Sequence, residues 1–235
     1  MVHSLFPNMN DDTLTQLINR ANGLPGPQII FTRPLAANVH VALAWLAAPS
    51  LADRAHRTAN GYNIYLIQNA AGVFAAAVLD MGEDLHWLVR KPFRGQGWLT
   101  NALRQVILPH LLQSRERQII SISKGLDVAD RLASEKVARD TGFVLLEDSA
   151  HERKFAFQPT EAQPEMPELT QVKPTMTEER LEELQHQLAY HAACLRLIQA
   201  EVAWTLAEGP VSEGLGDLAE EIQDHAGRLE TVWFA

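Results

Sequence analysis

At 235 residues, the chain is long enough for one large domain or for a medium-sized domain with an attached module. Its composition, 46% hydrophobic and 21% charged, is typical of a water-soluble globular fold. There is no apolar run near the ~20 residues of a membrane span, no secretory signal pattern in residues 1–7 and only one cysteine, so we expect a cytoplasmic protein without disulfides.

The net charge of −9 is unevenly distributed along the chain. Residues 1–160 carry 16 Lys and Arg against 14 Asp and Glu, a net of +2, whereas residues 161–235 carry 4 against 15, a net of −11. Such asymmetry usually marks separate modules. The first segment is not basic enough to indicate a nucleic-acid partner, and the second is too acidic for generic polyanion binding.

The N-terminal third is predicted to be mainly helical. Leu14, Leu17 and Ile18 lie at helical spacing behind an Asn/Asp cap, which predicts a short helix over residues 10–21 within an N-terminal extension, residues 1–27. A β-branched and aromatic run predicts a strand over 28–32. The alanine- and leucine-rich stretch 35–47 and a capped stretch 50–59 predict two further helices.

The middle of the chain predicts a mixed α/β sheet. Three strands over 62–68, 73–81 and 84–90 form a meander, because short turns separate them. A helix then runs to about residue 115 with one apolar stripe: Leu99, Leu103, Val106, Ile107 and Leu111. A strand over 119–123, a helix over 127–140 and a hairpin over 143–147 and 154–157 complete a fold that is part meander and part crossover.

The turn between the strand over 84–90 and the next helix is the most informative stretch. From position 94 it reads Arg-Gly-Gln-Gly-Trp-Leu-Thr. A turn of this kind points several backbone N–H groups at one spot, beside the positive end of a helix dipole. That arrangement suits a diphosphate group.

In its element order, the region around this turn resembles the GNAT superfamily of acyl-CoA N-acyltransferases. The pyrophosphate signature of that superfamily is Gln/Arg-x-x-Gly-x-Gly/Ala; Arg94 and Gly97 match it, and Leu99 stands in the last place. A second family element, a helix that closes on Gly-Phe before a strand, is similar to residues 134–143. The resemblance covers roughly residues 28–158 and implies a GNAT-like domain over 1–158.

This resemblance implies acetyl-CoA as co-substrate. The backbone of residues 95–99 and the Thr100 side chain would bind its diphosphate. The strands over 84–90 and 119–123 would splay apart around the pantetheine arm, and the acetyl carbonyl would face a backbone N–H near residues 86–88. The predicted cofactor-binding residues are Leu88, Val89, Arg94, Gly95, Gln96, Gly97, Trp98, Leu99 and Thr100.

Acetyl transfer to an amine also needs a base for the ammonium proton and an acid for the thiolate. Glu83 and His86 lie at the start of the fourth sheet strand, and His86 has a suitable intrinsic pKa. By alternation, His86 faces away from its two strand neighbours. The family commonly has a tyrosine as the acid where this chain has Ala138, so Ser134, Asp140 or a water are the alternatives. The predicted catalytic residues are therefore His86, Glu83 and Ser134.

The acceptor amine, a small molecule or a protein, is not identified by the sequence. In this fold the first two helices and the last hairpin typically recognise it, which directs attention to Trp45, His56, Arg57 and the loop 148–153. The predicted function is N-acetyl transfer by direct attack in a ternary complex. The alternative is a noncatalytic GNAT-like module that holds coenzyme A or recruits a partner.

The C-terminal segment differs in character from the rest. Residues 159–176 hold four of the twelve prolines and predict a semi-extended linker. Apolar residues at 3,4 spacing over 181–202 and 215–232 predict an antiparallel helical hairpin over 177–235. Because two helices alone expose an apolar face, we expect a homodimer through the hairpin, with docking on the chain's own body or on another protein as alternatives. His191, Cys194 and His225 lack a fourth ligand, so no metal site is predicted.

Overall fold

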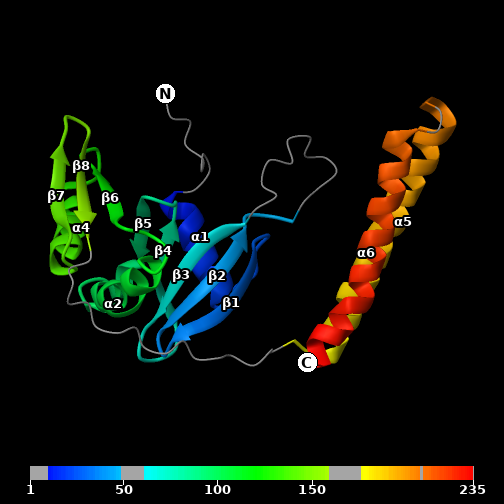
Figure 1. The fold of residues 1–235 in the computed structure, drawn as a ribbon. Coiled ribbons are helices and arrows are strands. Elements are labelled where there is room, and N and C mark those ends of the chain that lie inside the picture. Colours follow the sequence, from blue (N-terminus) through cyan, green and yellow to red (C-terminus); the bar gives the residue numbers. More distant parts are fainter. Residues whose placement is uncertain (1–9, 49–60, 159–175, 207–208, 235) are drawn as a thin grey trace. The chain divides into compact units, whose positions relative to one another are not determined.

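The computed structural model describes residues 10–48, 61–158, 176–206 and 209–234 (Figure 1). By its internal contacts the chain divides into two compact units, Met1–Gln171 and Val172–Ala235. The predicted helix over 50–59 and nearly all of the predicted linker lie outside the described residues. Within the described ranges, none of the helices combines the length and the apolar character that a membrane span needs.

The first unit is built on a five-stranded antiparallel sheet, in which neighbours in sequence are neighbours in the sheet. Its strands are β1 (Ile29–Ala36), β2 (Val39–Trp45), β3 (Tyr62–Gln68), β4 (Phe74–Asp80) and β5 (Leu85–Val89). A second antiparallel sheet has the order β6-β8-β7 and contains β6 (Gln118–Ser123), β7 (Val144–Asp148) and β8 (Glu152–Phe157). The predicted meander and the predicted final hairpin are both confirmed.

Helices cover both faces of the five-stranded sheet (Figure 1). α1 (Asp11–Ala21) covers one face, whereas α2 (Trp98–Ala102), the π-helical segment η2 (Leu103–Ile107) and α3 (Leu108–Leu111) cover the other. The short 3-10 helix η1 (Lys91–Phe93) precedes α2, and α4 (Val128–Asp140) packs against β6 of the second sheet. The predicted caps are present: the Asn10 side chain accepts a hydrogen bond from Thr13 N at 2.9 Å, and Asp127 accepts one from Ala129 N at 2.7 Å.

Two apolar clusters, one on each face of the sheet, form the core. Leu14, Leu17 and Ile18 of α1 are fully buried against one face. The predicted stripe of α2, η2 and α3 is buried against the other face, together with Tyr65 and Val78. Because strand side chains alternate between faces, each central strand contributes to both clusters.

The predicted helix over residues 35–47 is wrong. β1 continues to Ala36, and β2 returns from Val39 in antiparallel register, with Phe31 opposite Leu43. Side chains of β2 alternate between the two faces of the sheet, as strand side chains do. Val39 packs in the cluster that contains α2, whereas Ala42 packs in the cluster that contains α1. The helix propensity of alanine is a weak preference, which pairing with β1 and β3 overrides.

The second unit is the predicted antiparallel helical hairpin, formed by α5 (Glu178–Leu206) and α6 (Pro210–Phe234). The antiparallel sense is evident from two hydrogen bonds between the helices, Gln185 Nε2 to the carbonyl of Ala226 at 3.2 Å and Arg196 Nη2 to Gln223 Oε1 at 2.6 Å. The chain therefore has the predicted fold class, a mixed α/β unit with a C-terminal helix pair.

Candidate active site

A cleft opens where β5 and β6 part. At its closed end Ile119 N donates to the carbonyl of Glu83 at 2.9 Å, and Asp84 forms a parallel bridge with Ile119. Beyond this bridge β5 belongs to the five-stranded sheet and β6 to the three-stranded sheet. The expected splay between these two strands is therefore confirmed.

Asp84 joins the two strands at the point where they separate. Its Oδ1 accepts hydrogen bonds from Leu85 N at 2.8 Å and from Ser121 N at 3.0 Å. The side chain thus replaces the main-chain partner that β5 no longer offers to β6. Burial raises the pKa of the Asp84 carboxyl, although the hydrogen bonds from Ser121 and Leu85 act in the opposite direction.

We expect Asp84→Asn to be more stable than the wild type at neutral pH. The folded-state pKa of Asp84 lies above the unfolded value, so the wild type gains stability as the pH falls through that folded-state pKa. The advantage of the amide should therefore disappear below about pH 4, the ordinary pKa of the carboxyl. Urea unfolding between pH 3 and pH 8 measures this difference.

Asp84→Ala is the matched control. It removes the acceptor for both N–H groups and should cost about 1–3 kcal/mol of unfolding free energy at neutral pH. An Asn variant that is less stable than the wild type at neutral pH would contradict this account of the carboxylate.

The register of β5 determines which of its backbone groups face the cleft. Arg90 N donates to the carbonyl of Ala75, and the carbonyl of Asp84 accepts from Met81 N, so the even-numbered residues of β5 bond to β4. The odd-numbered residues therefore direct their N–H and C=O groups toward β6. In the described part of the chain, the N–H groups of Trp87 and Val89 have no hydrogen-bond partner.

The cleft has a volume of about 190 Å³ and gathers seven of the predicted site residues, which come from β5, α2, α4 and the turn that precedes α2. These residues are His86, Leu88, Val89, Arg94, Gly95, Leu99 and Ser134. The remaining predicted cofactor residues, Gln96, Gly97, Trp98 and Thr100, belong to the adjoining turn and the first turn of α2.

His86 faces α1, as its alternation with Leu85 and Trp87 predicts. Its Nε2 lies 2.8 Å from Oδ1 of Asp11, the first residue of α1. Both side chains line the cleft. Sequence reasoning missed Asp11, because 75 positions separate it from its partner and no local pattern links them.

Arg94 spans the opposite side of the cleft. Its Nε donates to the carbonyl of Val89 at 3.1 Å, and its Nη1 lies 2.6 Å from Oδ1 of Asp130 in the first turn of α4. The guanidinium therefore holds the end of β5 and the start of α4 together, and its charge has a carboxylate partner. Asp130 is a second cleft residue that the sequence did not single out.

The turn after Arg94 has the conformation that its glycines allow. Gly95 and Gly97 have φ angles of 74° and 79°, in the left-handed region that side chains disfavour. The N–H groups of residues 95–97 have no partner among the described residues, and those of the first turn of α2 have none within the helix. Leu99, where the resemblance to the GNAT superfamily implied a small residue, is only 4% exposed because its side chain packs in the core.

Of the other two predicted catalytic residues, Ser134 lines the cleft and Glu83 does not. Glu83 is exposed at the turn before β5 and does not line the cleft. Ser134 lines the cleft from α4, as does Val137 one turn later. Ala138, at the position where the resemblance implied a tyrosine, is fully buried in the core and does not line the cleft.

The predicted acceptor-recognition residues are dispersed. Trp45 contacts Phe31 edge-on with ring centroids 5.8 Å apart. In the loop 148–153, Arg153 forms ion pairs with the buried Glu135 at 2.8 Å and with Asp148 at 3.1 Å. His56 and Arg57 lie outside the described residues. Nowhere in the described ranges do three or more His, Cys, Asp or Glu side chains gather as a metal site would require.

No family model matches this chain, and no curated protein matches its sequence. One similar solved structure is described as "Crystal structure of a putative phosphinothricin N-acetyltransferase". The similarity covers 43% of this chain and 70% of that chain, with 15% sequence identity and a TM-score of 0.32.

Proposed function

We propose that this chain is a GNAT-type N-acetyltransferase that transfers the acetyl group of acetyl-CoA to an amine. The observation that carries the proposal is two groups of unpartnered backbone N–H groups beside the cleft, those of Trp87 and Val89 on β5 and those of residues 95–97 in the glycine turn. A pantetheine arm, which has two amides, can pair with such a strand edge as an added strand does. The turn at the start of a helix suits the diphosphate.

In this proposal each cleft residue has a separate role. Acetyl-CoA supplies an activated thioester whose carbonyl becomes an oxyanion during attack by the amine. The N–H of Trp87 is the donor that stabilises this oxyanion. His86 takes the ammonium proton, and Asp11 orients its ring. The Ser134 hydroxyl, directly or through a water, is the candidate for protonating the thiolate.

The experiment that tests this function has two parts. The melting temperature is measured with and without acetyl-CoA, and release of free thiol is then followed with a panel of amines. We expect a higher melting temperature with acetyl-CoA, since a ligand that binds only the folded state stabilises it. No shift would overturn the assignment. A shift without turnover on any amine would favour the noncatalytic alternative.

His86→Gln is expected to lower kcat about 100-fold or more without weakening acetyl-CoA binding, because the side chain acts on the amine proton. Asp11→Asn should lower kcat less, since Asp11 is a positioning residue 2.8 Å from the ring. The pH dependence of kcat/KM separates a proton-transfer role from a packing role. If His86→Gln retains the wild-type rate and pH profile, the base is a different group.

We further propose that the hairpin unit forms a homodimer through α5. Tyr190, Leu197 and Trp204 recur every seven residues and are 66%, 71% and 89% exposed. At 100° per residue, they lie on the side of α5 opposite Leu181, which is buried within the hairpin. A second copy of the same helix offers a matching apolar stripe.

The double variant Leu197→Glu/Trp204→Glu should convert the dimer to a monomer while leaving helix content unchanged. Light scattering measures the mass, and circular dichroism measures the helix content. Because the C-terminal segment is strongly acidic, the wild-type dimer should strengthen as salt screens the repulsion. Val211→Glu on α6 is the control outside the stripe. A wild type that is monomeric at all salt concentrations would contradict the proposal.

A further inference from the structure

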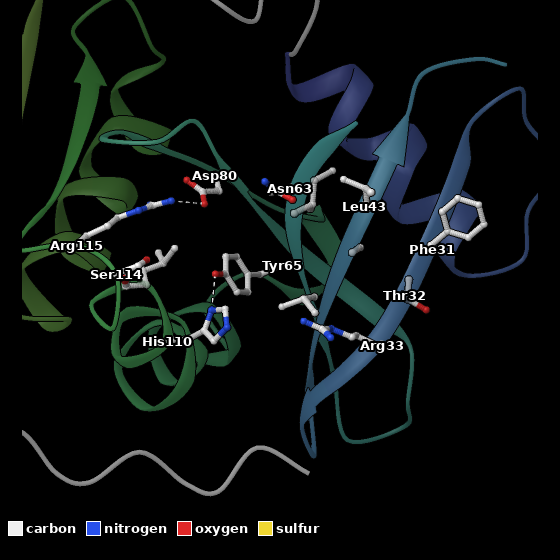
Figure 2. A pocket seen from close by; sticks show the side chains of 14 residues that line it. Phe31, Thr32, Arg33, Leu43, Asn63, Tyr65, Asp80, His110, Ser114 and Arg115 are labelled. Carbon is white, nitrogen blue, oxygen red and sulfur yellow. Dashed lines mark hydrogen bonds and ion pairs between the residues drawn. The ribbon is translucent and has the colours of Figure 1, made fainter. Parts of the chain in front are cut away.

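A second cavity, of about 500 Å³, lies in the first unit away from the cleft (Figure 2). Residues of β1, β2, β3, β4 and the end of α3 line it, and it shares none of its lining residues with the cleft. Its volume falls within the range of small-molecule sites, roughly 300–1,000 Å³. No role in acetyl transfer proposed above accounts for this cavity.

One wall of the cavity is apolar and open. Phe31 of β1 and Leu43 of β2 are paired across the strands, and they are 57% and 38% exposed. Val41, which faces the same side, is only half-buried. Val41 packs at the margin of the core cluster that includes η2 and α3, whereas Phe31 and Leu43 remain exposed. Exposed, contiguous apolar side chains of this kind are typical of binding sites.

The inner end of the cavity is polar and fixed. The Tyr65 hydroxyl lies 2.8 Å from His110 Nδ1, as the dashed line in Figure 2 marks. Burial raises the pKa of Tyr65 and lowers the pKa of His110, so both groups are neutral at pH 7 and share one hydrogen bond whose direction follows the imidazole tautomer.

The charges of the lining residues leave one cation uncompensated. Arg115 is paired with the largely buried Asp80 at 2.6 Å, and it also donates to the carbonyl of Gly82 at 2.7 Å. Arg33 is exposed, and no ion pair or hydrogen bond joins its side chain to another described residue. In Figure 2 its guanidinium extends from β1 toward the Tyr65–His110 pair. The described lining therefore carries a net charge of about +1 at neutral pH.

We propose that this cavity is a second binding site, which takes a small organic carboxylate with an apolar body. The carboxylate binds the Arg33 guanidinium, whose planar fork matches two carboxylate oxygens. The apolar body lies against Phe31, Val41 and Leu43. A monoanion balances the single uncompensated charge, whereas a cation would face Arg33 without a free carboxylate among the described lining residues.

The test uses the full-length protein and three probes of one shape: 4-phenylbutyrate, 4-phenyl-1-butanol and 4-phenylbutylamine. Isothermal titration calorimetry measures their dissociation constants. We expect the carboxylate to bind at least 10-fold more tightly than the alcohol and the amine to show no binding. Carboxylate binding that is absent at millimolar concentration, or equal to that of the alcohol, would overturn the proposal.

Two variants locate the bound carboxylate. Arg33→Gln should weaken phenylbutyrate binding about 10-fold, to the level of the alcohol, with an unchanged melting temperature because Arg33 is exposed. Arg94→Gln, in the cleft, should leave phenylbutyrate binding unchanged. If Arg33→Gln binds the carboxylate as the wild type does, the proposal is wrong. The acetyl-CoA melting shift is independent of all these outcomes, so failure of this site and failure of the acetyltransferase function are distinguishable.

Discussion

Trp87→Pro is expected to lower the kcat of acetyl transfer about 100- to 1,000-fold relative to Trp87→Ala, the usual effect of removing one oxyanion donor. The change removes a single backbone N–H, which points into the cleft and takes no part in the ladder between β5 and β4. Proline is tolerated at such a strand position because no ladder hydrogen bond is lost. The preceding residue, His86, is already in the extended conformation that proline requires.

Trp87→Ala is the control, since it removes the half-buried indole but keeps the N–H. Both variants lose the packing of the indole against the core, and we expect each to lose about 2 kcal/mol of stability. The difference between their rates therefore reports the N–H alone. Equal kcat values would show that this group does not stabilise the oxyanion. A difference confined to the dissociation constant of acetyl-CoA would instead assign the N–H to pantetheine binding.

Local patterns predicted much of the fold. The caps at Asn10 and Asp127 and the stripe from Leu99 to Leu111 depend on residues only a few positions apart, and the structure has them where expected. The glycine turn was also recognisable, since left-handed backbone at Gly95 and Gly97 requires the residue that the sequence supplies.

The features that the sequence did not predict depend on contacts between residues that are far apart in the chain. β2 is a strand because β1 and β3 flank it, which outweighs the helix propensity of its alanines. Asp11 reaches His86, and Asp130 reaches Arg94, only through the packing of α1 and α4 beside the cleft. The cavity beside Arg33 was missed for the same reason, since its lining comes from five separate elements.

Gly95→Asp is expected to weaken acetyl-CoA binding about 100-fold. At moderate concentrations, acetyl-CoA should therefore no longer raise the melting temperature of this variant. Its carboxylate would lie beside the N–H groups that are proposed to hold the diphosphate. Like charges a few ångströms apart repel by a few kcal/mol near a protein surface. The fold should tolerate the substitution, because a Cβ at Gly95 meets no atom within 4 Å.

Gly95→Asn is the uncharged control. It separates the effect of the negative charge on acetyl-CoA binding from the effect of replacing glycine on backbone conformation. Asn and Asp are the side chains that best tolerate a φ of 74°, and they have nearly the same shape. Both variants should therefore lose a similar free energy of unfolding without ligand, about 1 kcal/mol. Only Gly95→Asp should bind acetyl-CoA more weakly. High salt should partly restore binding to Gly95→Asp, because the repulsion is screened. If the two variants bind acetyl-CoA equally well, the diphosphate is not held at this turn.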